Sequence, residues 1–179
     1  MPLSVALGQT GSTEGAGGAL ARLCEPWAHA YASSKMLATV VTFGHVASLL
    51  MAGGLAVTTD RATLRTLRLA AVERGRHLAN LSGVHRLVLG GIALSFVTGV
   101  LLFASDVEAF VGSRIFWLKM LMIALLLGNG IAMNRAERTL RGDAAESAPA
   151  WTHLRRTALV SIALWYVITL AGVALVNVA

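Results

Sequence analysis

The chain has 179 residues, of which 56% are hydrophobic and 13% charged, and it carries a formal net charge of +6. A soluble domain usually contains about 25% charged residues, so this composition excludes an ordinary soluble fold, and it also excludes disorder. The single cysteine, Cys24, has no partner in the chain, which excludes a disulfide framework. Basic residues in excess are typical of the cytoplasmic loops of membrane proteins, and we therefore expect a lipid bilayer rather than a nucleic acid as the partner.

The first 34 residues form an outer tail in this interpretation. Residues 8–19 (GQTGSTEGAGGA) are rich in glycine, serine and threonine, which is typical of a flexible segment. Residues 20–34 contain Trp27 and Tyr31, side chains that favour the level of the lipid headgroups. We expect a short amphipathic piece there, lying along the outer interface.

Residues 35–179 are predicted to form one transmembrane domain. A spanning helix needs about 20 mostly apolar residues, because it rises 1.5 Å per residue through a core of roughly 30 Å. Segments that meet this requirement are found at residues 36–59, 81–105, 115–134 and 157–179. The sequence therefore predicts an all-α integral membrane four-helix bundle, since lipid offers no other partner for the backbone of such segments.

The basic residues predict the orientation of this bundle. Eleven of the 15 Lys and Arg residues lie in or beside the connections 60–80 and 135–156, and the other four lie at the opposite end. The positive-inside rule places both connections in the cytoplasm and both termini outside. Residues 61–80 mix leucines with arginines, which predicts either a surface helix holding anionic lipid or extensions of the first two spans.

Small residues recur on the spans at helical spacing, and they indicate where helices approach closely. The hydrophobic effect does not drive helices together inside a lipid bilayer, so close contacts between helices depend on small side chains. Such residues are Gly44, Ser48, Ala52, Gly53 and Gly54 in the first span, Ser95 and Gly99 in the second, and Ala124, Gly128 and Ala132 in the third. Four helices cannot bury all of these faces, which favours contact with other membrane subunits or a homo-oligomer.

Histidine is the main candidate for chemistry in this chain. The sequence has no nucleophile motif, phosphate-binding loop, dinucleotide turn, zinc-type cluster or intramembrane carboxylate pair, so no catalytic residue is predicted and a free-standing enzyme is not favoured. His45 lies near the middle of the first span, where an ionisable group is costly and indicates a functional site. Ala38 and Thr42 on its face leave lateral room that a porphyrin would need. The alternative is a neutral His45 that hydrogen-bonds a carbonyl or hydroxyl group on another helix.

His85 and His153 begin the second and fourth spans and are the other candidate haem or metal ligands. His45 lies roughly 13 residues from the inner end of its span and His85 only a few from the start of its own, an offset on the order of 10 Å. This offset counts against a simple two-histidine haem, and contact with headgroups is the alternative for His85 and His153. Under the haem hypothesis, Arg86, Arg155 or Arg156 would pair with the propionates.

Three stretches of the sequence resemble a known family. The segment FGHVASLLMAGGLAVTTDR resembles the first helix of bacterial copper-resistance D-type membrane domains, and residues 97–135 and 154–178 are similar to their later helices. The same layout resembles small four-helix membrane proteins related to b-type cytochromes. His45, Gly53, Gly54, Lys119, Asn134 and Arg135 are the family features that can be placed here.

The resemblance implies a multi-pass protein of the bacterial inner membrane. Its leading functional implication is a small subunit of an electron-transfer complex that binds haem b or docks beside a partner that does. Copper handling is the alternative, because thioether and imidazole ligands suit Cu(I) and methionines occur in the spans. A structural accessory subunit without a cofactor is the third possibility.

Overall fold

The computed structural model describes residues 16–67, 71–141 and 147–178, and every regular element in these ranges is a helix. The helices are α1 (Ala16–Ser33), α2 (Lys35–Thr66), α3 (Ala71–Ser105), α4 (Val107–Gly112), α5 (Arg114–Arg141) and α6 (Ala148–Val178). Four of them, α2, α3, α5 and α6, are long and apolar enough to cross a membrane. This confirms the predicted all-α bundle with four spans. Of the stretch predicted to be flexible, residues 8–15 lie outside the described residues, whereas residues 16–19 form the first turn of helix α1.

Single polar residues separate several of the helices and begin the next one. The side chains of Ser34, Asp106 and Ser113 each accept a hydrogen bond from the backbone N–H three residues later, at 3.3, 3.2 and 3.3 Å. Short polar side chains are preferred at this position because they satisfy one of the unpaired N–H groups of the first turn. The chain therefore turns sharply between α1 and α2, between α3 and α4, and between α4 and α5.

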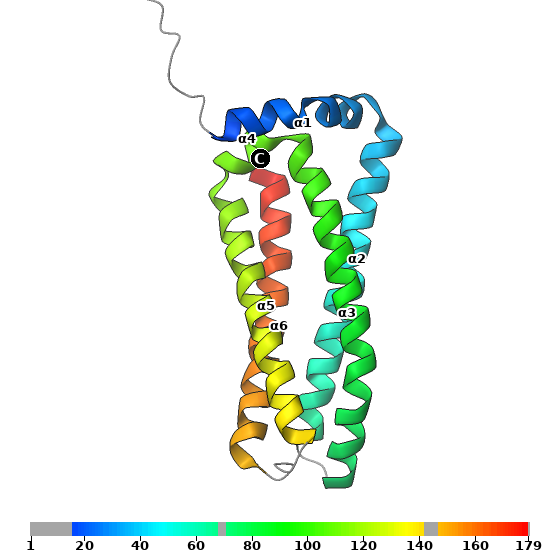
Figure 1. The fold of residues 1–179 in the computed structure, drawn as a ribbon, viewed down its shortest axis with the longest axis vertical. Coiled ribbons are helices and arrows are strands. Elements are labelled where there is room, and N and C mark those ends of the chain that lie inside the picture. The colour runs from blue at the N-terminus through cyan, green and yellow to red at the C-terminus, as the bar shows by residue number, and fades with distance from the viewer. Residues whose placement is uncertain (1–15, 68–70, 142–146, 179) are drawn as a thin grey trace, which may run out of the picture.

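The four long helices are arranged as two pairs (Figure 1). Helix α2 packs along α3 and α5 packs along α6, while α2 against α6 joins the pairs and α3 barely touches α5. The second and third spans are therefore consecutive in the sequence without being close neighbours. Helices α1 and α4 lie at one end of the bundle, together with the C-terminal end of α6 (Figure 1). We call this the α1 end and the opposite one the Arg-rich end.

Small residues bring α2 and α3 together, as the sequence predicts. A Cβ atom added at Gly91 of α3 would lie 2.9 Å from the Cβ of Ala52 and 3.3 Å from the carbonyl oxygen of Ser48. At Gly44 of α2, an added Cβ would lie 3.4 Å from the methyl group of Thr98. The backbones of the two helices thus approach to a distance that larger side chains would prevent.

The two pairs meet through Trp165 of α6, which lies over Gly53 of α2. A Cβ atom at Gly53 would come within 2.9 Å of the indole ring. Ala52, Leu126, Trp165 and Ile168 form the buried cluster at this level. Nearer the Arg-rich end, a second cluster joins α5 to α6 through Met133, Ala136, Leu140, Trp151 and Leu154. The packed interior is therefore concentrated in the middle and toward the Arg-rich end.

Helix α1 contains most of the segment predicted to lie at the outer interface, and it crosses the end of the bundle (Figure 1). The indole N–H of Trp27 donates a hydrogen bond of 2.8 Å to the carbonyl oxygen of Leu101 in α3. The hydroxyl groups of Tyr31 and Thr42 lie 3.1 Å apart, which links α1 to α2. Two polar contacts thus attach α1 to the α2–α3 pair.

The connection at residues 61–80 continues the helices on either side of it. Helix α2 extends to Thr66 and α3 begins at Ala71, so the described part of this connection consists of extensions of the first two spans. Of the two alternatives that the sequence left open, the structure therefore has the extensions and not a separate surface helix.

Candidate functional site

His45 is held against α3 by one edge of its ring. Its Nδ1 atom lies 3.0 Å from the carbonyl oxygen of Ser95 and 3.2 Å from the hydroxyl oxygen of Thr98. A carbonyl oxygen only accepts hydrogen bonds, so Nδ1 carries the proton in this arrangement and Nε2 keeps its lone pair. Metal-binding histidines characteristically donate the other ring N–H to a carbonyl or carboxylate in this way. The same contacts also satisfy the alternative prediction, a neutral histidine bonded to a neighbouring helix.

The surroundings of the imidazole combine a small residue and a cation. An added Cβ atom at Gly99 would lie 3.2 Å from Cε1 of His45, so the ring packs directly on the backbone of α3. Lys119 of α5 acts electrostatically on His45, and its Nζ atom lies 3.7 Å from the position of a Cβ at Gly172 in α6. The Lys119 side chain therefore extends along α6, and His45 lies between the two helix pairs with a cation from the opposite pair nearby.

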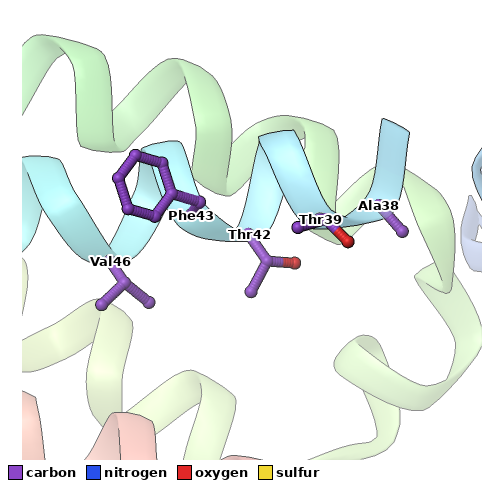
Figure 2. A pocket seen from close by; sticks show the side chains of 5 residues that line it. All are labelled: Ala38, Thr39, Thr42, Phe43 and Val46. Carbon is purple, nitrogen blue, oxygen red and sulfur yellow. The ribbon is translucent and has the colours of Figure 1, made fainter. Parts of the chain in front are cut away.

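A shallow, widely open cavity of about 520 Å³ lies beside His45 on the surface of α2. Its lining residues are Ala38, Thr39, Thr42, Phe43 and Val46. Figure 2 shows these residues on successive turns of α2, with Thr42 and Val46 directed toward α5 and α6. Farther along α2, the same face is covered by Trp165 at Gly53. The cavity thus occupies the part of this face, near the α1 end, where the two pairs no longer pack together.

The small-residue environment predicted for His45 is divided between two faces of α2. Ala38 and Thr42 line the cavity and provide the lateral room that the sequence predicts. Ser48 and Ala52 are instead buried against α3, where they contact Gly91. His45 lies between these faces and does not line the cavity itself.

The other candidate ligands lie elsewhere in the bundle. His85 precedes Ser95 by ten residues on α3, which is about 15 Å along the helix axis, and its Nδ1 lies 3.6 Å from Oε2 of Glu137. His153 is exposed on α6. The structure therefore does not bring His45, His85 and His153 together.

The arginines predicted to meet haem propionates lie at the Arg-rich end. Arg86, Arg155 and Arg156 are all exposed there, and Arg86 is separated from Ser95 by about 13 Å of α3. Their pairing with haem propionates stays a prediction. Lys119 is the basic residue that acts on His45 instead.

The methionines do not gather around His45. Met133 and Met122 pack in the core clusters, the methyl carbon of Met51 lies against Gly91, and Met36 is 79% exposed. In the part of the chain that the structure describes, no three His, Cys, Asp or Glu side chains are grouped to hold a metal ion.

Two carboxylates that the sequence analysis did not single out are buried in the bundle. Asp60 of α2 is 3% exposed and Glu137 of α5 is 2% exposed, and the charge of Asp60 acts on Glu137. The sequence indicates no intramembrane carboxylate pair because both residues lie in connections rich in arginine. Helical periodicity could have indicated that they are buried. Asp60 lies on the same face of its helix as Gly53, two turns earlier, and Glu137 lies on the same face as Met133, one turn earlier.

The chain matches no protein-family model, no curated protein and no solved structure. The resemblance to copper-resistance D-type domains and b-type cytochromes therefore rests on the residues quoted above and stays a prediction. The four apolar helices make the chain a multi-pass membrane protein in contact with lipid.

Proposed function

We propose that the chain is a small subunit of an electron-transfer complex in the bacterial inner membrane, and that it binds haem b through Nε2 of His45. The observation that supports this best is the hydrogen bond between Nδ1 of His45 and the carbonyl oxygen of Ser95. It fixes the ring and leaves Nε2 as the nitrogen able to bind iron. A bound haem would supply one-electron chemistry, and the protein would supply the ligand and an apolar environment.

The cavity on α2 supports the same proposal by its lining. It is shallow, widely open and formed by side chains of α2 alone, so it could hold one face of a flat group. Its walls come from apolar side chains and two threonines, a lining suited to a flat, mostly apolar group. Gly99 lets the ring of His45 pack directly on the backbone of α3, because a side chain at this position would crowd Cε1 of the imidazole.

His45 is the residue of this chain that would hold the iron. His85 lies about 15 Å along α3 from the residue that His45 contacts, so it would not bind the same iron. Lys119 is the residue that we propose to bind an anionic group of the cofactor. Copper handling stays the alternative.

The visible absorption spectrum of the purified protein tests this proposal. The full chain is expressed in a bacterial host supplied with a haem precursor and extracted in mild detergent. We expect a Soret band in the wild type and its loss in His45→Ala, because the iron loses its only ligand from this chain. His29→Ala provides the matched control, since His29 is exposed on α1 and should keep the wild-type haem content.

Two results would overturn the proposal. The first is a wild-type protein without a Soret band after haem-replete expression. The second is full haem content in His45→Ala together with a lower melting temperature, which would make His45 a packing residue.

The partner surface that we propose is the side of α5 that carries Ala124 and Gly128. An added Cβ atom at Gly128 would meet nothing within 4 Å, and Ala124 is exposed. This small-residue face from the sequence is therefore not used inside the bundle. In lipid it offers another subunit, or a second copy of this chain, a surface for close backbone approach.

A further inference from the structure

The Arg-rich end of the bundle contains a polar cluster to which all four long helices contribute. Asp60 comes from α2, His85 from α3, Glu137 and Arg141 from α5, and Ser161 from α6. The Ser161 side chain hydrogen-bonds the carboxylate of Asp60. Oε2 of Glu137 lies 3.6 Å from Nδ1 of His85 and 4.0 Å from Nη2 of Arg141. We call these five residues the inner polar cluster.

Each carboxylate in the inner polar cluster has one oxygen atom without a partner. Oδ2 of Asp60 and Oε1 of Glu137 are buried and accept no hydrogen bond from the residues that the structure describes. Leaving a buried charged oxygen unpaired costs several kcal/mol, and such groups commonly become neutral instead. The two free oxygens therefore indicate that a small positive species belongs at this position.

The charges of the cluster lead to the same conclusion. Among the described residues, Arg141 is the permanent cation that acts on Glu137, and His85 is the other titratable group beside this carboxylate. Asp60 is bonded by the hydroxyl group of Ser161, and its negative charge acts on Glu137. The cluster thus holds two carboxylates and one permanent positive charge, and one further cation would make it neutral.

The geometry points to a proton as this cation. We infer that the inner polar cluster is a proton-binding site, in which Asp60 and Glu137 together hold one proton and His85 exchanges it with water. A metal ion requires several ligands, and no three acidic, histidine or cysteine side chains are grouped to supply them in the described ranges. A proton needs a single acceptor oxygen. The side chain of His85 is 33% exposed, whereas that of Glu137 is 3% exposed, so the imidazole connects water to the buried carboxylate.

The exchange step is a simple proton transfer. His85 takes a proton from a hydronium ion and leaves a water molecule. When its Nδ1 moves from 3.6 Å to hydrogen-bond distance of Oε2 of Glu137, it gives the Nδ1 proton to this oxygen, which converts the imidazolium and the carboxylate into a neutral imidazole and a carboxylic acid. No electron or other group moves. Asp60 belongs to the α2–α3 pair and Glu137 to the α5–α6 pair, so the bound proton removes like-charge repulsion between the two helix pairs.

Infrared spectroscopy of the full chain in lipid nanodiscs tests this inference without reference to haem. At neutral pH we expect the carbonyl band of a protonated carboxylic acid in the wild type. Asp60→Asn and Glu137→Gln should each remove this band, because each takes away the like charge that favours the acid form of the remaining carboxylate. Glu25→Gln, which changes an exposed carboxylate of α1, is the matched control and should keep the band.

A second measurement tests the role of His85. After transfer to heavy water, the band should shift at least about tenfold more slowly in His85→Ala than in the wild type, a factor equivalent to roughly 1.4 kcal/mol in the barrier. The size of the band before transfer should not change. An unchanged exchange rate would remove His85 from the proposal, since a purely structural histidine does not control exchange.

Three outcomes would overturn the proton site. One is a wild type with no carboxylic acid band at neutral pH, which would mean that water and Arg141 suffice for both carboxylates. Another is a band that persists in both carboxylate variants, and the third is a band that sodium chloride abolishes and potassium chloride does not. If the variants fail to fold, heavy-carbon labelling of aspartate or glutamate side chains assigns the band in the wild type.

Discussion

The environment of individual polar residues in this bundle is set by the neighbouring helices. His45 would be a costly feature in an isolated apolar helix, yet its Nδ1 is satisfied by the carbonyl oxygen of Ser95. Asp60 and Glu137 would be ordinary solvated carboxylates at the ends of isolated helices. They become buried because α2 and α5 extend beyond their apolar segments as parts of the bundle, where α2 packs on α3 and α6 and α5 packs on α6.

Gly53 and Gly54 provide a direct test of packing at the residue scale. An added Cβ at Gly53 would lie 2.9 Å from the rigid indole of Trp165, whereas at Gly54 it would meet nothing within 4 Å. We expect Gly53→Ala to lower the free energy of unfolding by about 1–3 kcal/mol through overpacking. Gly54→Ala should leave it unchanged or raise it by about 0.5–1 kcal/mol, because alanine favours helix.

Thermal unfolding of both variants in the same detergent measures this difference. Equal melting temperatures for Gly53→Ala and Gly54→Ala would show that the α2–α6 contact is not as close as the structure describes.

Helix α1 packs against α3, α4 and α2, and two polar contacts fix its place. The hydrogen bond from Trp27 to Leu101 attaches it to α3, and the Tyr31 hydroxyl lies near Thr42 of α2. The length and apolar character of the four spans were readable from the sequence because lipid imposes both. The position of α1 across the bundle end depends on the carbonyl oxygen of Leu101, and no sequence pattern identifies this group as the acceptor for Trp27.

Trp27→Phe tests the attachment of α1. The substitution keeps an aromatic ring and removes the indole N–H, so we expect a loss of about 0.5–1.5 kcal/mol from α1 docking. Hydrogen exchange of the α1 backbone amides should become faster, with little change in the central turns of α5 and α6. Leu23→Ala is the control, because Leu23 is 79% exposed. Equal exchange in Trp27→Phe and the wild type would contradict the attachment.

The whole molecule presents two chemically different ends. Helices α1 and α4 and the C-terminal end of α6 lie at one end, and the arginine-rich connections lie at the other (Figure 1). Which end faces the cytoplasm is predicted from the basic residues alone.

Cysteine labelling in intact cells tests the orientation. In a Cys24→Ser background, a membrane-impermeant maleimide should react with Glu108→Cys in α4 and not with Arg138→Cys in α5, although both side chains are exposed. The physical reason is that arginine-rich segments remain on the cytoplasmic side during insertion. Permeabilised cells, in which both positions should react, provide the control. The reverse pattern would place the termini in the cytoplasm.

The partner surface on α5 is also tested at the scale of the whole molecule. Native mass measurement after gentle extraction should show a complex larger than one 18.8 kDa chain with its detergent or lipid. Gly128→Leu should dissociate it, because a bulky side chain blocks close backbone approach. Gly130→Leu is the matched control on the same helix, since this glycine also has nothing within 4 Å of an added Cβ but lies on another face. A single chain across several mild detergents would contradict the proposal.

The sequence by itself determined the membrane class, the four spans and the small residues of α2 that allow another helix to approach closely, but not Gly91 of α3, which lies opposite them. These properties are local: hydropathy over about 20 residues and small side chains at four-residue spacing decide them. It also identified His45 as unusual for its depth. None of these conclusions required knowing which helix lies beside which.

Only the tertiary structure decided how the helices pair and which polar groups meet. Because α2 rather than α3 joins the two pairs, Asp60 comes within electrostatic reach of Glu137, 77 positions later in the chain. The same arrangement separates His45 from His85, although both face the bundle from neighbouring helices. Contacts of this kind depend on the rotation and depth of each helix, which side chains from all four helices set together and no single segment encodes.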